Sequence, residues 1–428
     1  MDKIMIPEIL GIICSFLDIK SVRRFRLCCK AFAHVGACYA YRNVVFFLHH
    51  GDLDMLNRIS LDPIASKNVR SLVYMNYTLG RRKMGREDFR QCYSTMRHFE
   101  KFLARQRGLA PAPPMDHNDL SKLYEEYEAT LEQQEKILQA NTDFSRIREA
   151  VSRFPALQEI TMSSDSWFWS GKNTPFKSSL GLAAGLLEPM GCRHLDSLLA
   201  AVSEADIKLK KLSAGILSWQ FFQKPLAKLG QSLSLMTDLT SLQLTIETTD
   251  DTEQCKQLLG TGLLRGFLKT LTKLQTLHIV FTCDSEYDLD LYAPRLDDII
   301  DRAHRWDDLD SLTLGYVTCE RQELMSILKR HKNTLRELCL QDIFFRTTSW
   351  LTFLPKVRRT MDLDHACLCG ELHGAEEPFG HQEFWDLDEQ SDLREDVNDY
   401  LVNDNIRRCP LNNRNLIDWD EPGFAPMF

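Results

Sequence analysis

The sequence lacks the features that define several large classes of protein. It contains no run of 18 apolar residues, so no segment is expected to span a membrane. Its 13 cysteines include no C-x-x-C pair and are odd in number, which is typical of reduced thiols in a cytoplasmic or nuclear protein. Neither a phosphate-binding glycine loop nor a nucleophile elbow is present. We therefore expect no catalytic site and no cofactor.

A strong overall charge of one sign is also missing, although charge is unevenly distributed along the chain. The formal net charge is −8; residues 1–50 carry seven Lys and Arg against three Asp and Glu, whereas residues 376–428 carry four against fourteen. Without a broad basic surface the protein is not expected to bind nucleic acid. The basic N-terminal segment indicates either an acidic partner or a solvated polar face.

The first forty residues have the pattern of three short helices. Pro7 suits the first position of a helix, and Glu8 places negative charge in the first turn. After a polar break at residues 18–21, Ser21 is a candidate cap for a second helix, and a third begins near Cys28. The apolar residues of the first helix recur on one face: Ile9, Leu10, Ile13, Phe16 and Leu17. Helices this short cannot bury all these side chains, so a partner or the rest of the chain should cover some of them.

This segment resembles the F-box family from end to end. The resemblance covers residues 4–42 without a gap, and it departs from the family mildly, with Ile6 in place of the leading leucine and Ile19-Lys20-Ser21 as an unusual turn. It is carried by Ile6-Pro7-Glu8-Ile9-Leu10, by Ile12-Ile13-Cys14-Ser15-Phe16-Leu17-Asp18, and by Val22 with Arg26-Leu27-Cys28-Cys29-Lys30-Ala31-Phe32.

In F-box proteins this module docks on a Skp-family adaptor, which links it to a cullin. The resemblance implies a non-catalytic substrate receptor of a Skp–cullin–F-box ubiquitin ligase, with a protein target of unknown identity. A scaffold that uses the same adaptor outside ubiquitination is the alternative. Ile13 and Phe25 could equally belong to the internal core of the three helices. The residues implied to build or support the adaptor interface are Ile6, Pro7, Ile9, Leu10, Ile13, Leu17, Val22, Leu27, Cys28 and Phe32.

An L-x-x-L-x-L pattern, with apolar variants, occurs six times in the rest of the chain. Alternating apolar residues predict a short strand, and helical patterns at 255–268, 296–303 and 324–331 lie between copies. Such units cannot bury their faces alone, so they predict a leucine-rich-repeat-like solenoid, with ordinary α/β packing as the alternative. The copies begin at Leu157, Leu209, Leu239, Leu274, Leu309 and Leu335, with a weaker copy at Val69.

The expected fold class is therefore α/β: a small three-helix F-box followed by an irregular leucine-rich-repeat-like solenoid. This layout looks like the F-box/leucine-rich-repeat proteins that are numerous in filamentous fungi. We expect a helix at 119–140 and the least order at 80–118, where prolines favour a loop. The expected divisions are an F-box at 1–45, a connecting region with the helical insert and Pro-rich loop at 46–146, the repeats at 147–360, and an acidic C-terminal cap or mobile tail at 361–428.

Two further clusters have binding chemistry. Trp167-Phe168-Trp169 is a candidate for target binding, since exposed aromatic residues are common at binding hot spots, or a buried plug between repeats. His365-x-Cys367-x-Cys369-x-x-x-His373 offers the donors that zinc prefers. The C-x-C spacing is tighter than the usual ligand gap, so we interpret these thiols as buried or incidental and expect no metal site.

Overall fold

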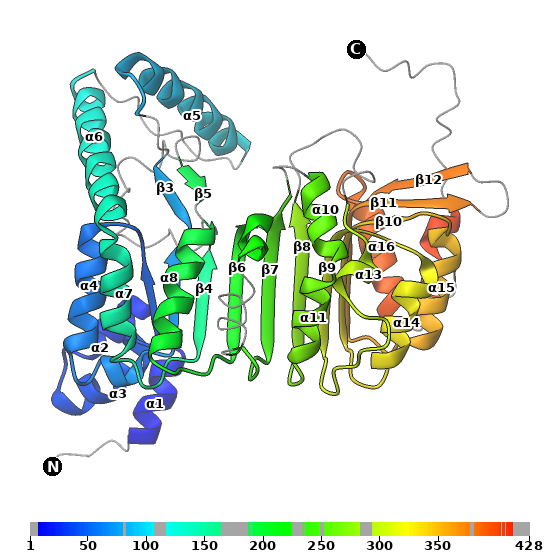
Figure 1. Cartoon of the computed structure of the whole chain (residues 1–428), viewed down its shortest axis with the longest axis horizontal. Coiled ribbons are helices and arrows are strands. Elements are labelled where there is room, and N and C mark those ends of the chain that lie inside the picture. Colours follow the sequence, from blue (N-terminus) through cyan, green and yellow to red (C-terminus); the bar gives the residue numbers. More distant parts are fainter. Residues whose placement is uncertain are drawn as a thin grey trace. The chain divides into compact units, whose positions relative to one another are not determined.

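A computed structural model describes residues 7–79, 83–106, 117–163, 187–189, 191–224, 234, 236–248, 252–282, 293–376, 381–403, 405–406 and 408–413. Within these residues the protein is mixed α/β, with an open ten-stranded sheet that is mostly parallel (Figure 1). The predicted α/β class is thereby confirmed. The chain divides into two compact units, one made of residues 1–209 and 214–216 and the other of residues 210–213 and 217–428.

The first unit begins with three short helices, as expected, and continues with strands and helices. β1 pairs with β2 and β2 with β4, both in parallel, whereas β3 pairs with β5 in antiparallel fashion. Its elements are α1 (Pro7–Ser15), α2 (Ile19–Phe25), α3 (Lys30–Ala40), β1 (Asn43–Phe46), α4 (His50–Leu61), η1 (Ser66–Asn68), β2 (Ser71–Met75), β3 (Tyr77–Leu79), α5 (Arg86–Gln106), α6 (His117–Ala140), α7 (Thr142–Val151), β4 (Glu159–Ser163), β5 (Leu187–Pro189) and α8 (Gly191–Glu204).

The second unit shares β6 (Lys211–Ser218) with the first and continues the alternation of strands and helices. From β7 to β11 each strand pairs in parallel with the next, and β12 closes the series in antiparallel fashion. Its other elements are η4 (Trp219–Gln223), β7 (Ser241–Glu247), α10 (Thr252–Gly260), α11 (Leu263–Thr270), β8 (Thr276–Thr282), α13 (Leu296–Ile299), β9 (Ser311–Cys319), α14 (Arg321–His331), β10 (Glu337–Phe345), α15 (Trp350–Thr360), β11 (His365–Glu376), β12 (His381–Asp386), α16 (Ser391–Val402) and η5 (Pro410–Asn413).

The fourth and sixth positions of the L-x-x-L-x-L copies form continuous buried rows across neighbouring strands. In the second unit one row is Leu242, Leu277, Leu312, Leu338 and Ala366, and the next is Leu244, Ile279, Leu314, Leu340 and Leu368. All ten side chains are buried. The alternate residues, such as Gln243, Thr313 and Cys367, are exposed or half-buried and lie on the opposite face, which we name the open face. The copies thus place one apolar side of each strand in the core.

The backbone repeats with the same spacing as the side chains. The carbonyl oxygen just after the first position of a copy accepts two amide protons from the next copy. The Thr240 oxygen, for example, accepts from Gln275 at 2.8 Å and Thr276 at 3.0 Å. Equivalent pairs of bonds converge on the oxygens of Arg42, Arg70, Lys210, Gln275, Asp310 and Arg336. One structural unit therefore recurs, although the intervening segments differ in length.

A residue with left-handed backbone recurs inside the strands. Ile216, Tyr316, Asp342 and Gly370 have φ angles of 47°, 55°, 49° and 69°. Ile216, Tyr316 and Asp342 each stand seven residues after the first position of a copy, and at Asp342 the pairing with β11 shifts register. A bulge of this kind bends a strand and re-aims the side chains that follow it. Only one of the four residues is a glycine, so the others adopt a conformation that most residues avoid.

The helical insert of the first unit differs from the sequence expectation. The helix predicted at 119–140 is α6, but Arg86–Gln106, within the stretch expected to have the least order, forms helix α5. Phe89 of α5 packs against Tyr124 and Tyr127 of α6, with ring centroids 5.2 Å apart in both pairs. The buried Gln134 side chain of α6 bonds both the N–H and the C=O of Leu79, at 2.8 and 2.9 Å. The ring contacts thus attach α5 to α6, and the Gln134 bonds attach α6 to β3.

The acidic C-terminal segment caps the last parallel strand over residues 381–403. Strand β12 pairs with the second half of β11, and α16 covers the edge of the first half. Leu368 donates its amide proton to Asn398 Oδ1 at 2.6 Å, and Leu387 donates to the Gly370 oxygen at 3.0 Å. Of the two sequence-based alternatives, cap and mobile tail, these residues form a cap.

Of the three helical patterns predicted between the repeats, two lie in helices and the third gives only a short one. The pattern at 324–331 lies in α14, and the pattern at 255–268 lies in α10 and α11, which are separated at Gly262. The pattern at 296–303 gives only the four-residue α13, because Ile300 is extended and Ala303 donates its amide proton to Asp301 Oδ1 instead. The apolar spacing could not reveal that the Asp301 side chain competes with the helix for the Ala303 amide proton.

We expect Asp52 to make the first unit less stable as pH rises. Burial raises the pKa of its carboxyl to about 6, opposed by the hydrogen bond from Phe47 N at 2.9 Å. The folded state therefore binds this proton more tightly than the unfolded chain, and the free energy of unfolding falls between about pH 4 and pH 6. Asp52→Asn should be about 2 kcal/mol more stable than wild type at pH 7 and equal to it at pH 4. Urea unfolding of both proteins at the two pH values measures this, and parallel pH profiles would contradict it.

Candidate functional site

The candidate site lies on the first three helices, whose ends are fixed by local interactions. Helix α1 begins at Pro7, with Glu8 in its first turn. The cap of α2 is Asp18 rather than the expected Ser21: Asp18 Oδ1 accepts the Ser21 amide proton at 2.6 Å. Hydrogen bonds from the Ser21 side chain and from its amide hold the pKa of the Asp18 carboxyl below its ordinary value. The cap fixes the turn that joins α1 to α2.

A small core holds these helices together. Leu10 and Cys14 of α1, Val22 of α2 and Ala37 of α3 are buried, and burial raises the pKa of the Cys14 thiol. The rings of Phe25 and Phe32 stack with centroids 4.2 Å apart, so Phe25 belongs to the packing between α2 and α3. For Phe25 this packing favours the internal role over contact with an adaptor. Ile13 is half-buried.

A second set of apolar side chains on the same helices is exposed. Among the described residues, eight large apolar side chains are exposed, and five of them lie between residues 9 and 27. Burying a side chain of this size contributes about 1.5–3 kcal/mol, so leaving five in water forgoes a large stabilisation. Such a concentration is typical of a binding surface. We name it the apolar surface: Ile9 (47% exposed), Ile12 (59%), Phe16 (85%), Ile19 (45%) and Leu27 (85%).

Exposed basic side chains accompany the apolar surface on the same helices. Lys20, Arg23, Arg24 and Lys30 are exposed on or beside α2 and at the start of α3, whereas Glu8 and Asp18 are the acidic residues of α1 to α3 and their connections. Apolar and basic side chains on one set of helices are complementary to a partner that has an apolar groove and acidic margins.

The ten residues predicted for the adaptor interface fall into four groups. Pro7, Ile9, Leu27 and Cys28 are exposed, and Ile13, Leu17 and Phe32 are half-buried. Leu10 and Val22 are buried, so they support the surface from beneath and do not themselves reach a partner. Ile6 lies outside the described residues, as do the target-binding candidates Trp167, Phe168 and Trp169.

Three exposed residues were absent from the predicted interface. Ile12, Phe16 and Ile19 belong to the segment that carries the F-box resemblance, yet only the structure places them on the surface. A signal was present, since Ile9, Ile12 and Phe16 follow the i, i+3, i+7 spacing of one helical face.

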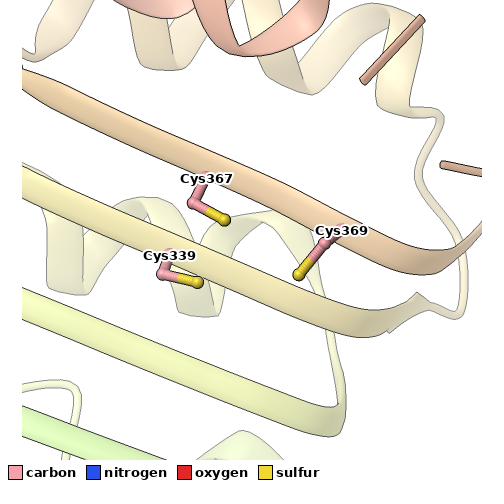
Figure 2. Close-up of side chains that lie close together, drawn as sticks. All are labelled: Cys339, Cys367 and Cys369. Carbon is pink, nitrogen blue, oxygen red and sulfur yellow. The ribbon is translucent and has the colours of Figure 1, made fainter. Parts of the chain in front are cut away.

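The residues with metal-binding chemistry are arranged differently from the sequence expectation. The sulfur atoms of Cys339, Cys367 and Cys369 lie within 4.8 Å of one another on the open face. Figure 2 shows the three side chains on two neighbouring strands. Cys339 had not been part of the sequence constellation. His365 and His373, which had been, do not join this group, and His373 Nε2 lies 3.0 Å from Glu371 Oε2.

The comparisons with known proteins do not place this chain in a family. No protein-family model matches it, and no curated protein matches it significantly. Among the described helices, none combines the length and the apolar composition that a membrane crossing requires.

Proposed function

We propose that the protein is a non-catalytic substrate receptor of a Skp–cullin–F-box ubiquitin ligase, acting in the cytoplasm or nucleus. Its N-terminal helices bind a Skp-family adaptor and, through it, a cullin. The observation that carries this proposal is the apolar surface, because five exposed apolar side chains gather on the segment that resembles the F-box. The basic side chains on the same helices add attraction for an acidic adaptor and would increase the rate of association.

The repeating region is a leucine-rich-repeat-like solenoid that holds the protein target. Buried rows, shared carbonyl oxygens and left-handed residues each recur with the copies, which supports a stack of similar units rather than an unrelated α/β packing. The open face offers polar, half-exposed side chains such as Gln243, His278 and Gln341. A surface built from successive strands can diverge in sequence while the buried rows stay the same.

The protein acts by proximity. Binding the target and the adaptor at once raises the effective concentration of target lysines near a catalytic centre that other subunits supply. No group of this chain takes part in bond making, so the receptor determines which protein is modified.

Binding of the full chain to a recombinant Skp-family adaptor tests the proposal. We expect wild-type protein to retain the adaptor in a pulldown, and Phe16→Asp/Leu27→Asp to bind at least ~100-fold more weakly by calorimetry. Both side chains are 85% exposed, so the change removes contact area without entering the core. Placing two carboxylates in an apolar interface adds a desolvation cost.

The matched control is Leu61→Asp/Ile64→Asp, which changes two exposed apolar side chains outside the apolar surface. This variant should bind like wild type. Absence of binding by wild-type protein, or equal loss in the two variants, would contradict the proposal. Co-purification of a cullin with the adaptor complex separates a ligase receptor from a scaffold that uses the adaptor alone.

A further inference from the structure

Three cysteine side chains converge on the open face near its C-terminal edge. Cys339 of β10 and Cys367 of β11 are register partners on neighbouring strands, and Cys369 follows two residues later on the same side of β11 (Figure 2). Their sulfur atoms lie within 4.8 Å of one another, and all three residues are half-buried. Register partners on adjacent strands and alternate residues of one strand are the nearest neighbours that a sheet face offers.

We propose that Cys339, Cys367 and Cys369 bind one Zn²⁺ ion as three thiolates, with the fourth coordination position held by water. Zinc–sulfur bonds of about 2.3 Å at tetrahedral angles place the sulfur atoms about 3.8 Å apart. The three sulfur atoms lie within 4.8 Å of one another, close to that spacing. Three thiolates suit a soft metal ion better than Mg²⁺ or Ca²⁺, which prefer oxygen ligands.

The backbone that carries Cys367 and Cys369 is held on both sides. Between and after the two cysteines, the Leu368 amide donates to Asn398 Oδ1 at 2.6 Å, and the Gly370 amide donates to Asp388 Oδ1 at 3.2 Å. Asp342 Oδ1 accepts the amide proton of Glu371 at 2.8 Å from the neighbouring strand. These bonds fix the donor positions before an ion arrives, and such pre-organisation favours binding.

Zinc binds cysteine as thiolate, so ion binding and loss of the thiol protons are coupled. The bound state would be Zn²⁺ with three thiolates, a net charge of −1, formed with release of three protons to solvent.

Titration of the reduced full-length chain with Co²⁺, a coloured substitute for zinc, tests the proposal. We expect saturation at one equivalent, with the sulfur-to-cobalt charge-transfer absorption and the visible bands of a tetrahedral ion, and displacement by Zn²⁺. Each of Cys339→Ser, Cys367→Ser and Cys369→Ser should weaken zinc binding at least ~100-fold, since loss of an outer-shell partner alone costs about 10–100-fold.

Cys29→Ser/Cys38→Ser removes two exposed thiols far from the cluster in sequence and should bind cobalt like wild type. Circular dichroism of every variant separates loss of a ligand from loss of the fold. A charge-transfer band that survives in the three cluster variants would overturn the proposal. So would wild-type protein that binds no ion, or a Cys339–Cys367 disulfide found by mass spectrometry in the protein titrated with zinc. The outcome is independent of adaptor binding.

Discussion

Leu314→Ala is expected to lower the free energy of unfolding of the second unit by about 3–4 kcal/mol. Leu314 lies on β9 between Ile279 of β8 and Leu340 of β10, in the middle of a buried row. Its side chain is fully buried, and the neighbouring strands cannot close the cavity without losing their register. Urea unfolding followed by tryptophan fluorescence measures the change, because Trp306 and Trp350 are buried in the same unit.

The adjacent residue provides the control. Thr313 is half-buried on the open face, so Thr313→Ala should change the free energy of unfolding by less than about 0.5 kcal/mol. A similar loss from both substitutions would mean that the two faces of β9 are equally packed. The one-sided architecture that the copies indicate would then be wrong.

The L-x-x-L-x-L pattern located individual strands correctly but did not find every strand of this kind. All six copies found by the L-x-x-L-x-L pattern lie on strands with their fourth and sixth residues buried. The structure adds copies at Tyr41-x-x-Val44-x-Phe46 and Leu363-x-x-Ala366-x-Leu368, which lie in the same rows. The first uses aromatic and β-branched residues, and the second places alanine at its fourth position.

The N-terminal helices show the same limit at the level of single residues. Helical periodicity predicted an apolar face on α1, and the structure has two stripes. One contains the buried Leu10 and Cys14, and the other contains the exposed Ile9, Ile12 and Phe16. Which stripe faces inward depends on where α3 packs, through Ala37 and Ala40, and this contact is not local in sequence. The sequence therefore located the candidate surface but did not separate its contacting residues from its supporting ones.

The cysteine cluster was less predictable still. Cys367 and Cys369 were visible as a pair, but Cys339 is 28 residues from Cys367 and reaches it only through the register of β10 and β11. That register depends on the buried rows on the other face of the sheet. A slip of one residue would move Cys339 into the core, so the proposed metal site depends on the same leucines that hold the fold.

Gly370→Ala is expected to destabilise the second unit by about 3–4 kcal/mol. Gly370 has a φ of 69°, and left-handed backbone costs a residue with a Cβ atom about 1–2 kcal/mol. An added Cβ would also collide with the Asp342 carboxylate, which accepts the Glu371 amide proton at 2.8 Å. Displacing that carboxylate leaves a half-buried amide without its partner, at a further cost of about 1–3 kcal/mol. Urea unfolding measures the sum, and Gly266→Ala in α11, which meets no atom within 4 Å, should be neutral or stabilising.

A double-mutant cycle separates the two causes. Asp342→Ala alone loses the bond to Glu371 and should itself be destabilising. In the Asp342→Ala protein the collision with the carboxylate is gone. Adding Gly370→Ala should then lower the free energy of unfolding only by the cost of the left-handed backbone, about 1–2 kcal/mol. An equal cost in both backgrounds would show that Asp342 does not restrict Gly370. Coupling of the expected size would mean that consecutive left-handed residues are packed against each other. The bulges would then form a second line of contacts from strand to strand, beside the leucine rows, and this line would set the direction in which each strand continues beyond its bulge.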